Sequence, residues 1–250
     1  MTIAANLAAI QQRIARSATR SGRGAEDVEL MAVSKTQPAE RIVEAYDAGQ
    51  RLFGENRVQE FADKHAALER LVGTKQPGAP TRPVGEPVGV EFHMIGHLQS
   101  NKAPRAAELF SAIDSLDSAK LADRLNASAE KLGRTLGVLI EINIGGELAK
   151  TGLAPESHEL EQILAGAPRW PHLRIQGLMT VPPFTDDPEG ARPYFRRLRQ
   201  LRDQIAARDL PSVRMNLLSM GMSHDFEVAI EEGSTCVRIG TAIFGERPKP

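Results

Sequence analysis

The stretch Glu29-Leu-Met-Ala-Val-Ser-Lys-Thr-Gln-Pro-Ala-Glu40 contains the repeating unit of the fold. Its first half is an apolar run without alternation, which is typical of a strand covered on both faces in a parallel sheet. Its second half carries Pro38, a residue favoured in the first turn of a helix. The stretch therefore predicts a strand followed at once by a helix, with Lys35 at the carboxyl end of the strand.

The same pattern recurs along the whole chain of 250 residues. Apolar runs predict eight strands, at 28–34, 51–53, 91–95, 110–113, 137–144, 173–181, 213–219 and 236–239. Helices are predicted at 2–18, 39–48, 56–71, 118–132, 156–165, 189–208 and 225–232. This order and length predict an α/β fold, a single (β/α)8 TIM barrel with an extra N-terminal helix. An open doubly wound sheet is the alternative, but no glycine-rich phosphate loop follows the first strand.

Composition and charge narrow the class of protein. With 41% hydrophobic and 25% charged residues, residues 1–250 can form one globular domain, and the four prolines of 73–90 predict a surface loop insertion. With a net charge of −1, the chain has no positive electrostatic field that would attract nucleic acid, so nucleic acid is not an expected partner. Residues 1–16 lack the apolar core of a signal peptide, so we expect a cytoplasmic protein without membrane contact. The single cysteine, Cys236, allows no intrachain disulfide.

Lys35 is the candidate reactive residue. An amine at the end of a buried strand is poorly hydrated and held in place, and these conditions favour a Schiff-base nucleophile. The alternative is a lysine that extends to solvent. The catalytic and binding residues of such barrels lie at the carboxyl ends of the strands. Asn56 follows the second strand, where it could either contact a ligand or cap the next helix. His93 and His97 follow the third strand region without a third ligand, so no metal site is expected.

The loops after the last two strands resemble a phosphate site. Ser223 precedes a predicted helix, which it is placed to cap, and the free amide groups there could hold an anion. Gly240 and Thr241 offer a bare backbone and a hydroxyl in the next loop. Two ordinary turns are the alternative. A reactive lysine and a phosphate site at one barrel mouth suggest pyridoxal 5'-phosphate (PLP) as the cofactor.

Arg238 lies two residues before Gly240, so strand alternation places both on one face. A guanidinium facing the pyridine nitrogen cannot accept its proton, so the ring would stay neutral and be a weak electron sink. The alternative is an ion pair with Glu227, Glu231 or Glu232.

Six ordered motifs resemble one known family, the pyridoxal phosphate homeostasis proteins of the YggS/PROSC type. They are Ala32-Val-Ser-Lys-Thr36, Phe53-Gly-Glu-Asn-Arg-Val-Gln-Glu60, Phe92-His-Met-Ile-Gly-His-Leu-Gln-Ser-Asn-Lys102, Gly177-Leu-Met-Thr180, Leu218-Ser-Met-Gly-Met-Ser223 and Val237-Arg-Ile-Gly-Thr-Ala-Ile-Phe-Gly245. The resemblance implies a barrel of the alanine-racemase type, PLP fold type III. It implies Lys35 as the Schiff-base residue, Asn56 near the ring, Arg238 at the ring nitrogen, and Ser223, Gly240 and Thr241 on the phosphate. Family members bind the cofactor, influence vitamin B6 and amino-acid balance, and have no established catalytic activity.

The chain departs from this family in two places. The insertion at 73–90 is longer than the usual connection, and His224 stands where a small or acidic residue is common. Neither change removes a predicted cofactor contact, but the insertion puts in doubt any partner surface carried over from that side.

The sequence thus predicts a PLP carrier or buffer for vitamin B6 homeostasis, which holds PLP as an internal aldimine on Lys35. We expect a monomer without catalytic turnover, with apo PLP-dependent enzymes as candidate partners. A PLP-dependent amino-acid racemase or decarboxylase is the alternative, but racemization needs an acid or base opposite the lysine. The two tyrosines, Tyr46 and Tyr194, fall in helices that should face away from the mouth. A cofactor-free Schiff-base aldolase would leave Arg238 without a role.

Overall fold

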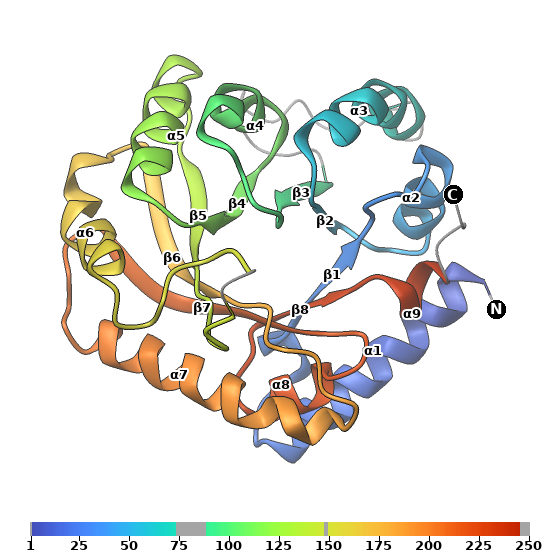
Figure 1. The fold of residues 1–250 in the computed structure, drawn as a ribbon. Helices are drawn as coiled ribbons and strands as arrows, with labels where there is room; N and C mark the ends of the chain where they lie inside the picture. Colours follow the sequence, from blue (N-terminus) through green and yellow to red (C-terminus); the bar gives the residue numbers. More distant parts are fainter. Residues whose placement is uncertain (1, 74–88, 148–149, 246–250) are drawn as a thin grey trace.

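The computed structural model describes residues 2–73, 89–147 and 150–245 (Figure 1). The predicted surface loop over 73–90 lies outside these residues except for its first and last two positions. No helix within the described residues is long and apolar enough to cross a membrane.

Eight parallel strands close into a barrel in chain order (Figure 1). The strands are β1 (Glu29–Val33), β2 (Leu52–Glu55), β3 (Glu91–Met94), β4 (Ala112–Leu116), β5 (Leu136–Glu141), β6 (Leu173–Met179), β7 (Val213–Met222) and β8 (Cys236–Ile239). Closure comes from β8, which pairs in parallel with β1 so that Leu30 lies opposite Val237. The predicted barrel is confirmed, and the open doubly wound alternative is wrong.

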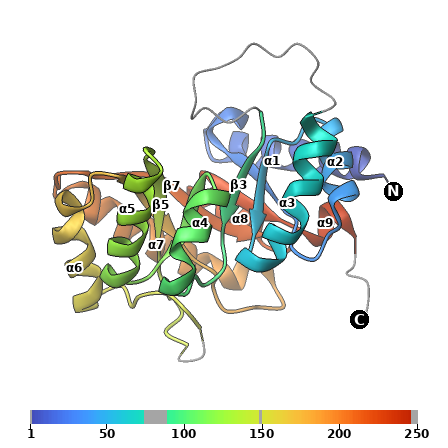
Figure 2. The ribbon, with the colours of Figure 1, turned by 90° about the horizontal axis from the view of Figure 1, so that it is seen from above.

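Helices surround the barrel (Figure 2). They are α1 (Ile3–Arg20), α2 (Ala39–Asp47), α3 (Val58–Gly73), α4 (Ala103–Leu109), α5 (Ala119–Lys131), α6 (His158–Gly166), α7 (Arg192–Ala206), α8 (Phe226–Glu231) and α9 (Thr241–Phe244). Short 3-10 helices lie at Ala25–Asp27, Ser100–Lys102, Ala167–Arg169 and Pro188–Ala191. The sequence did not predict α4 and α9, because both are too short to show an apolar period and α4 buries only alanines.

Alternate residues of the strands face two different apolar regions. Residues such as Val237 and Ile239 pack in the main core between strands and helices. Met31, Leu52 and Cys236 form a separate cluster inside the barrel. Burial raises the pKa of the Cys236 thiol, which therefore packs as a neutral apolar group.

The N-terminal helix α1 supports the last strand-to-helix unit. Its residues Ile3, Leu7, Ile10 and Ile14 are buried at helical spacing, and it packs beside α8 and α9 (Figure 1). The side chain of Asn6 donates a hydrogen bond of 2.8 Å to the carbonyl oxygen of Ile243. This contact anchors α9, which begins at Thr241 in the predicted phosphate site.

Candidate functional site

Lys35 lies at the mouth of the barrel, two residues after β1, and is half-buried. The amide of the preceding Ser34 donates to the carbonyl oxygen of Gly54 at 3.0 Å, which ties this segment to β2. The next residue, Thr36, has a φ of 63°. This left-handed conformation is unusual for a β-branched residue, so the chain is strained directly beside the candidate nucleophile.

Two charged side chains, those of Glu55 and Lys64, contact Ser34, the residue before Lys35. The fully buried carboxylate of Glu55 accepts from the Ser34 hydroxyl at 2.6 Å and pairs with the ammonium of Lys64 at 2.7 Å. Burial raises the pKa of Glu55, whereas the charge of Lys64 and its hydrogen bond lower it. Sequence reasoning missed Lys64. The available signal was Glu55 itself, because a carboxylate at the end of a buried strand needs a cation nearby.

Asn56 follows β2 and is half-buried. Its Oδ1 is buried and has no hydrogen-bond partner among the described residues. The loop after β3 packs tightly against its backbone, since a Cβ added at Gly96 would lie 2.4 Å from the Asn56 carbonyl oxygen. A buried oxygen without a partner is rare in a folded protein and indicates a position that a ligand or water can satisfy.

Arg238 is 4% exposed, and its guanidinium donates to the hydroxyl of Ser219 at 2.6 Å and to the carbonyl oxygen of Thr180 at 2.7 Å. The predicted alternative, an ion pair with a glutamate of the α8 region, is wrong. Those glutamates pair with other arginines: Glu227 with Arg13, Glu231 with Arg20 and Arg192, and Glu232 with Arg192, Arg196 and Arg199. Within the described residues, no carboxylate comes within ion-pair distance of Arg238, so two neutral oxygens hold its charge in the barrel.

The loops after β7 and β8 carry the three residues predicted to hold a phosphate. Gly240 lies next to β1, where an added Cβ would be 3.4 Å from the carbonyl oxygen of Val33. Thr241 begins α9 and its side chain is exposed, whereas Ser223 is half-buried after the end of β7. The first amide groups of a helix have no partner inside it, so α9 presents donors beside the Thr241 hydroxyl.

The prediction that Ser223 caps the following helix is wrong. That helix, α8, begins at Phe226, and its N-cap residue is Asp225. The carboxylate of Asp225 accepts from the amide of Met222 at 2.7 Å, which fixes the turn. Since Ser223 lies inside this turn, its hydroxyl is not committed to capping α8.

The six predicted residues come from four consecutive strands of the closed barrel. Ser223 follows β7, Arg238 lies on β8 with Gly240 and Thr241 directly after it, Lys35 follows β1 and Asn56 follows β2. The two central strands of these four, β8 and β1, pair in a register that sets Met31 opposite Arg238. The structure therefore brings all six to one sector of the mouth.

Glu141 ends β5, half-way around the barrel from β1, and the sequence analysis did not identify it. It is 7% exposed, and one carboxyl oxygen accepts from the Thr151 hydroxyl at 2.8 Å. The other oxygen is buried without a hydrogen-bond partner among the described residues. Burial raises the pKa of Glu141, and the nearby Asp117 raises it further, while Arg238 lowers it.

His224, where the family resemblance implies a small or acidic residue, contacts the loop after β6. Its Nε2 lies 3.1 Å from the carbonyl oxygens of both Thr185 and Asp186. Its ring lies 5.5 Å from that of Phe184, whose side chain is exposed. An acidic side chain has no N–H to donate to these carbonyls, so the histidine gives this loop a contact of its own.

Two histidines, one on β3 and one in the loop after it, lie beside acids. His93 Nδ1 lies 3.2 Å from Asp114, and His97 Nδ1 lies 2.9 Å from Asp117. Burial alone would lower the pKa of His93, but the acids Asp114 and Glu91 raise it to about 10. No cluster of three or more potential metal ligands occurs in the described part of the chain.

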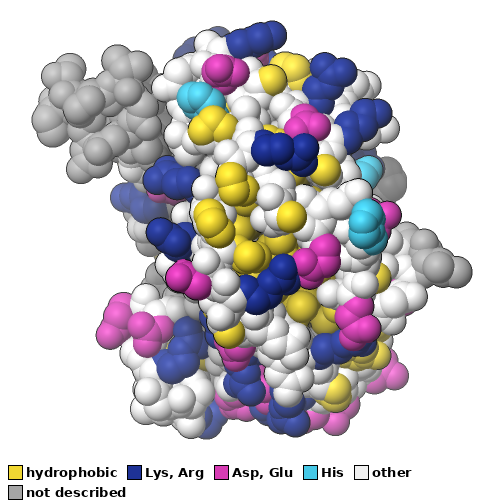
Figure 3. All heavy atoms as spheres, turned by 90° about the vertical axis from the view of Figure 1, so that its left-hand side faces the viewer, with side chains coloured by type: hydrophobic (Ala, Val, Ile, Leu, Met, Phe, Trp, Pro, Cys, Tyr) yellow, Lys and Arg dark blue, Asp and Glu magenta, His cyan; other side chains and the backbone are white. Residues whose placement is uncertain are grey.

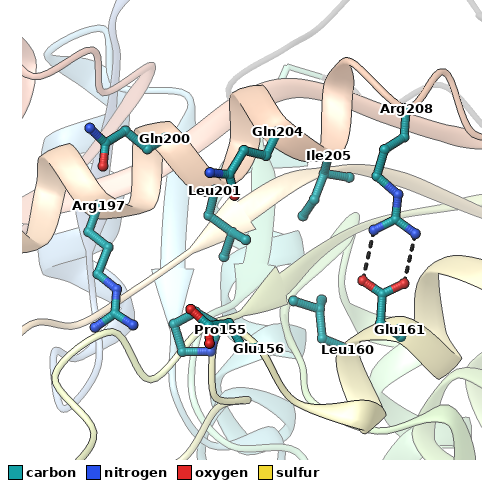
Figure 4. A pocket seen from close by; sticks show the side chains of 10 residues that line it. All are labelled: Pro155, Glu156, Leu160, Glu161, Arg197, Gln200, Leu201, Gln204, Ile205 and Arg208. Carbon is teal, nitrogen blue, oxygen red and sulfur yellow. Dashed lines mark hydrogen bonds and ion pairs between the residues drawn. The ribbon is translucent and has the colours of Figure 1, made fainter.

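A separate groove of about 490 Å³ lies on the outer surface between α6 and α7 (Figure 4). Apolar side chains of Leu160, Leu201 and Ile205 line it, and Arg208 pairs with Glu161 at 2.7 Å at one end. The face that carries α6 shows apolar side chains among charged ones (Figure 3). The helices that form this groove lie outside the barrel, so it is separate from the residues around Lys35.

Comparisons with known proteins agree with this geometry. The family described as alanine racemase, N-terminal domain, matches residues 5–248. The pyridoxal phosphate homeostasis protein of Aquifex aeolicus (strain VF5) is 43% identical over 247 residues, which cover 99% of each chain. The chain belongs to the pyridoxal phosphate homeostasis family. Another member, from Escherichia coli (strain K12), is 43% identical over 245 residues, or 98% of this chain and 97% of the relative.

Among solved structures, PipY of Synechococcus elongatus PCC7942 is similar to this chain over nearly its whole length. It is 35% identical, and the match covers 98% of this chain and 100% of PipY. The TM-score is 0.78 for PipY without PLP and 0.75 for PipY with PLP bound. The predicted alanine-racemase type of barrel and the family assignment from sequence motifs are both confirmed.

Proposed function

We propose that this chain binds pyridoxal 5'-phosphate on Lys35 and acts in PLP homeostasis, as a cytoplasmic carrier or buffer. The observation that carries this proposal is the arrangement of an amine, a buried guanidinium and a hydroxyl-and-amide loop pair on consecutive strands of one barrel mouth. The names of the relatives and the PLP-bound PipY structure support it. We further propose that the whole chain is one domain and that it works as a monomer.

The residues present fit the chemical groups of PLP. The amine of Lys35 would condense with the aldehyde of PLP, forming a C=N bond and releasing one water. Ser223, Gly240 and Thr241 would hold the phosphate, and Arg238 would meet the ring nitrogen. The buried Oδ1 of Asn56, which lacks a partner among the described residues, would be satisfied beside the ring.

Arg238 favours a carrier over an enzyme. A guanidinium stays protonated even when burial lowers its pKa, as it does here, so it cannot take up the proton of the ring nitrogen. When bound, PLP supplies an electrophilic aldehyde, and its strength as an electron sink depends on protonation of that nitrogen. Both tyrosines lie on outer helices, as predicted, where they pack against the main core. Glu141 is a buried acid at the end of β5, on the wall opposite β1, and its burial limits its access to a ligand.

Release would occur by hydrolysis or by exchange with an incoming amine at the open mouth. The receiving amine could be the lysine of an apo PLP-dependent enzyme, so such enzymes are the proposed partners. Exchange conserves the C=N bond: a new one forms to the incoming amine as the one to Lys35 breaks, and the Lys35 amine is restored.

The test is a visible spectrum of the purified protein after incubation with PLP, before and after borohydride reduction. We expect a yellow protein that loses its colour on reduction and carries the cofactor on the peptide containing Lys35. A cofactor-free aldolase would be colourless once unbound PLP has been removed. Reduced cofactor found on Lys102 or Lys150 instead would contradict the assignment of Lys35.

A further inference from the structure

The segment that carries Lys35 is held from outside the barrel. We call residues 34–37 the Lys35 loop; it connects β1 to α2 through Thr36, whose φ is 63°. A threonine does not keep this conformation without support, because its Cβ branch crowds the backbone there. Something in the fold must therefore fix the loop against relaxation.

Two charged side chains of α3 bind the backbone of this loop. Glu60 Oε1 accepts from the amide of Thr36 at 2.5 Å. Lys64 Nζ donates to the carbonyl oxygens of Ser34 at 3.1 Å and of Gln37 at 3.3 Å. These contacts lie one residue before Lys35 and one and two residues after it, and we call Glu60 and Lys64 the α3 clamp.

Lys64 is itself held rigidly. Its side chain is 12% exposed, and its ammonium pairs at 2.7 Å with Glu55, whose side chain is fully buried. Glu60 lies 3.6 Å from the same ammonium, one helical turn away. The three protons of the ammonium thus point to three fixed oxygens: one of Glu55 and two carbonyls of the Lys35 loop.

We propose that Lys64 is a positioning residue for Lys35: the α3 clamp holds the strained loop so that the Lys35 amine faces the cofactor aldehyde. This inference rests on the proposed function. Since Lys64 binds the loop and not the phosphate site, its loss should affect the covalent bond to PLP and spare non-covalent binding. That difference separates positioning from general support of the fold.

The test compares two ligands that share ring and phosphate. PLP condenses with Lys35, whereas pyridoxamine 5'-phosphate has an amine in place of the aldehyde and cannot. Two variants each remove one side chain of the clamp: Glu60→Ala, and the double variant Lys64→Met with Glu55→Gln. In each, we expect the affinity for PLP to fall about tenfold, the scale of one charged hydrogen bond. Affinity for pyridoxamine 5'-phosphate should stay within about twofold, and Lys64→Arg should retain most of the PLP affinity.

The Glu55→Gln change is included because Lys64→Met alone would leave a buried carboxylate without its cation. Glu60→Ala leaves the pair of Glu55 and Lys64 intact, so it tests the clamp even if the double variant does not fold. Asp63→Asn, an exposed change on the same helix, is the matched control.

Equal losses for both ligands would overturn the proposal, because Lys64 would then support the whole site. Unchanged PLP affinity in both clamp variants would overturn it as well. If the wild-type protein forms no covalent bond with PLP, the proposed function and this inference are both wrong. If the wild type and the clamp variants retain PLP equally well, only the inference is wrong.

Discussion

The phosphate site can be tested by removing its two hydroxyls. Ser223→Ala together with Thr241→Val deletes one half-buried and one exposed donor while leaving the backbone of the α9 turn in place. A hydrogen bond to a charged acceptor contributes about 1.5–3 kcal/mol, and the exposed Thr241 should lie at the lower end because water competes for the phosphate. We therefore expect a loss of roughly 2–4 kcal/mol in binding free energy, or about 30- to 1,000-fold in dissociation constant.

The assay is equilibrium dialysis of PLP and of pyridoxal, the same aldehyde without the phosphate. The double variant should bind pyridoxal almost as the wild type does, because Lys35 and Arg238 remain. Its melting temperature should change little, since neither side chain is fully buried. An equal loss for both aldehydes would refute the reasoning and show that the phosphate lies elsewhere.

Three further predictions concern the chemistry of the mouth. Lys35→Ala should abolish the PLP that borohydride fixes on the protein, which peptide mapping checks. It should shift the free energy of unfolding by less than about 1 kcal/mol, because the side chain is half-buried, and denaturant unfolding checks this. Glu141→Gln should gain stability relative to the wild type as pH rises. The raised pKa of Glu141 means that the folded state favours the protonated acid, so this contribution is lost as pH rises through the folded-state pKa, which unfolding at several pH values would detect. In deuterated water, alanine and serine should exchange their α-protons slowly; racemization at about 1 per second would be an enzyme's rate and would contradict the carrier role.

The sequence predicted the barrel because its strands are covered on both faces and read as continuous apolar runs. It also predicted that Lys35 lies at the carboxyl end of the first strand region and Arg238 on the last strand, because strand alternation and the carboxyl-end rule are local. The start of α8 was misjudged, since the side chains of Ser223 and Asp225 are both good caps and only the turn bonded to Met222 decides between them.

The α3 clamp could not be predicted in the same way. Lys64 is one of several charged residues on α3, and nothing in its local pattern distinguishes it from those that face solvent. Its role depends on how α3 is oriented above β1 and β2, which is set by packing across the barrel. Glu141, like Glu55, is an acid in an apolar strand and could have been noticed for that reason, but its missing hydrogen-bond partner is known only from the structure.

The closure of the barrel has a consequence for biosynthesis. Lys35 follows the first strand of the barrel and Arg238 lies on the last, yet these two strands are neighbours. While the polypeptide is still emerging from the ribosome, the early strands have no β8 beside them, and the phosphate loops do not yet exist. Stable capture of the cofactor must therefore wait until β8 has been translated. A nascent chain stalled before Cys236 should retain no PLP once unbound cofactor has been removed, so retained yellow colour would report a finished barrel.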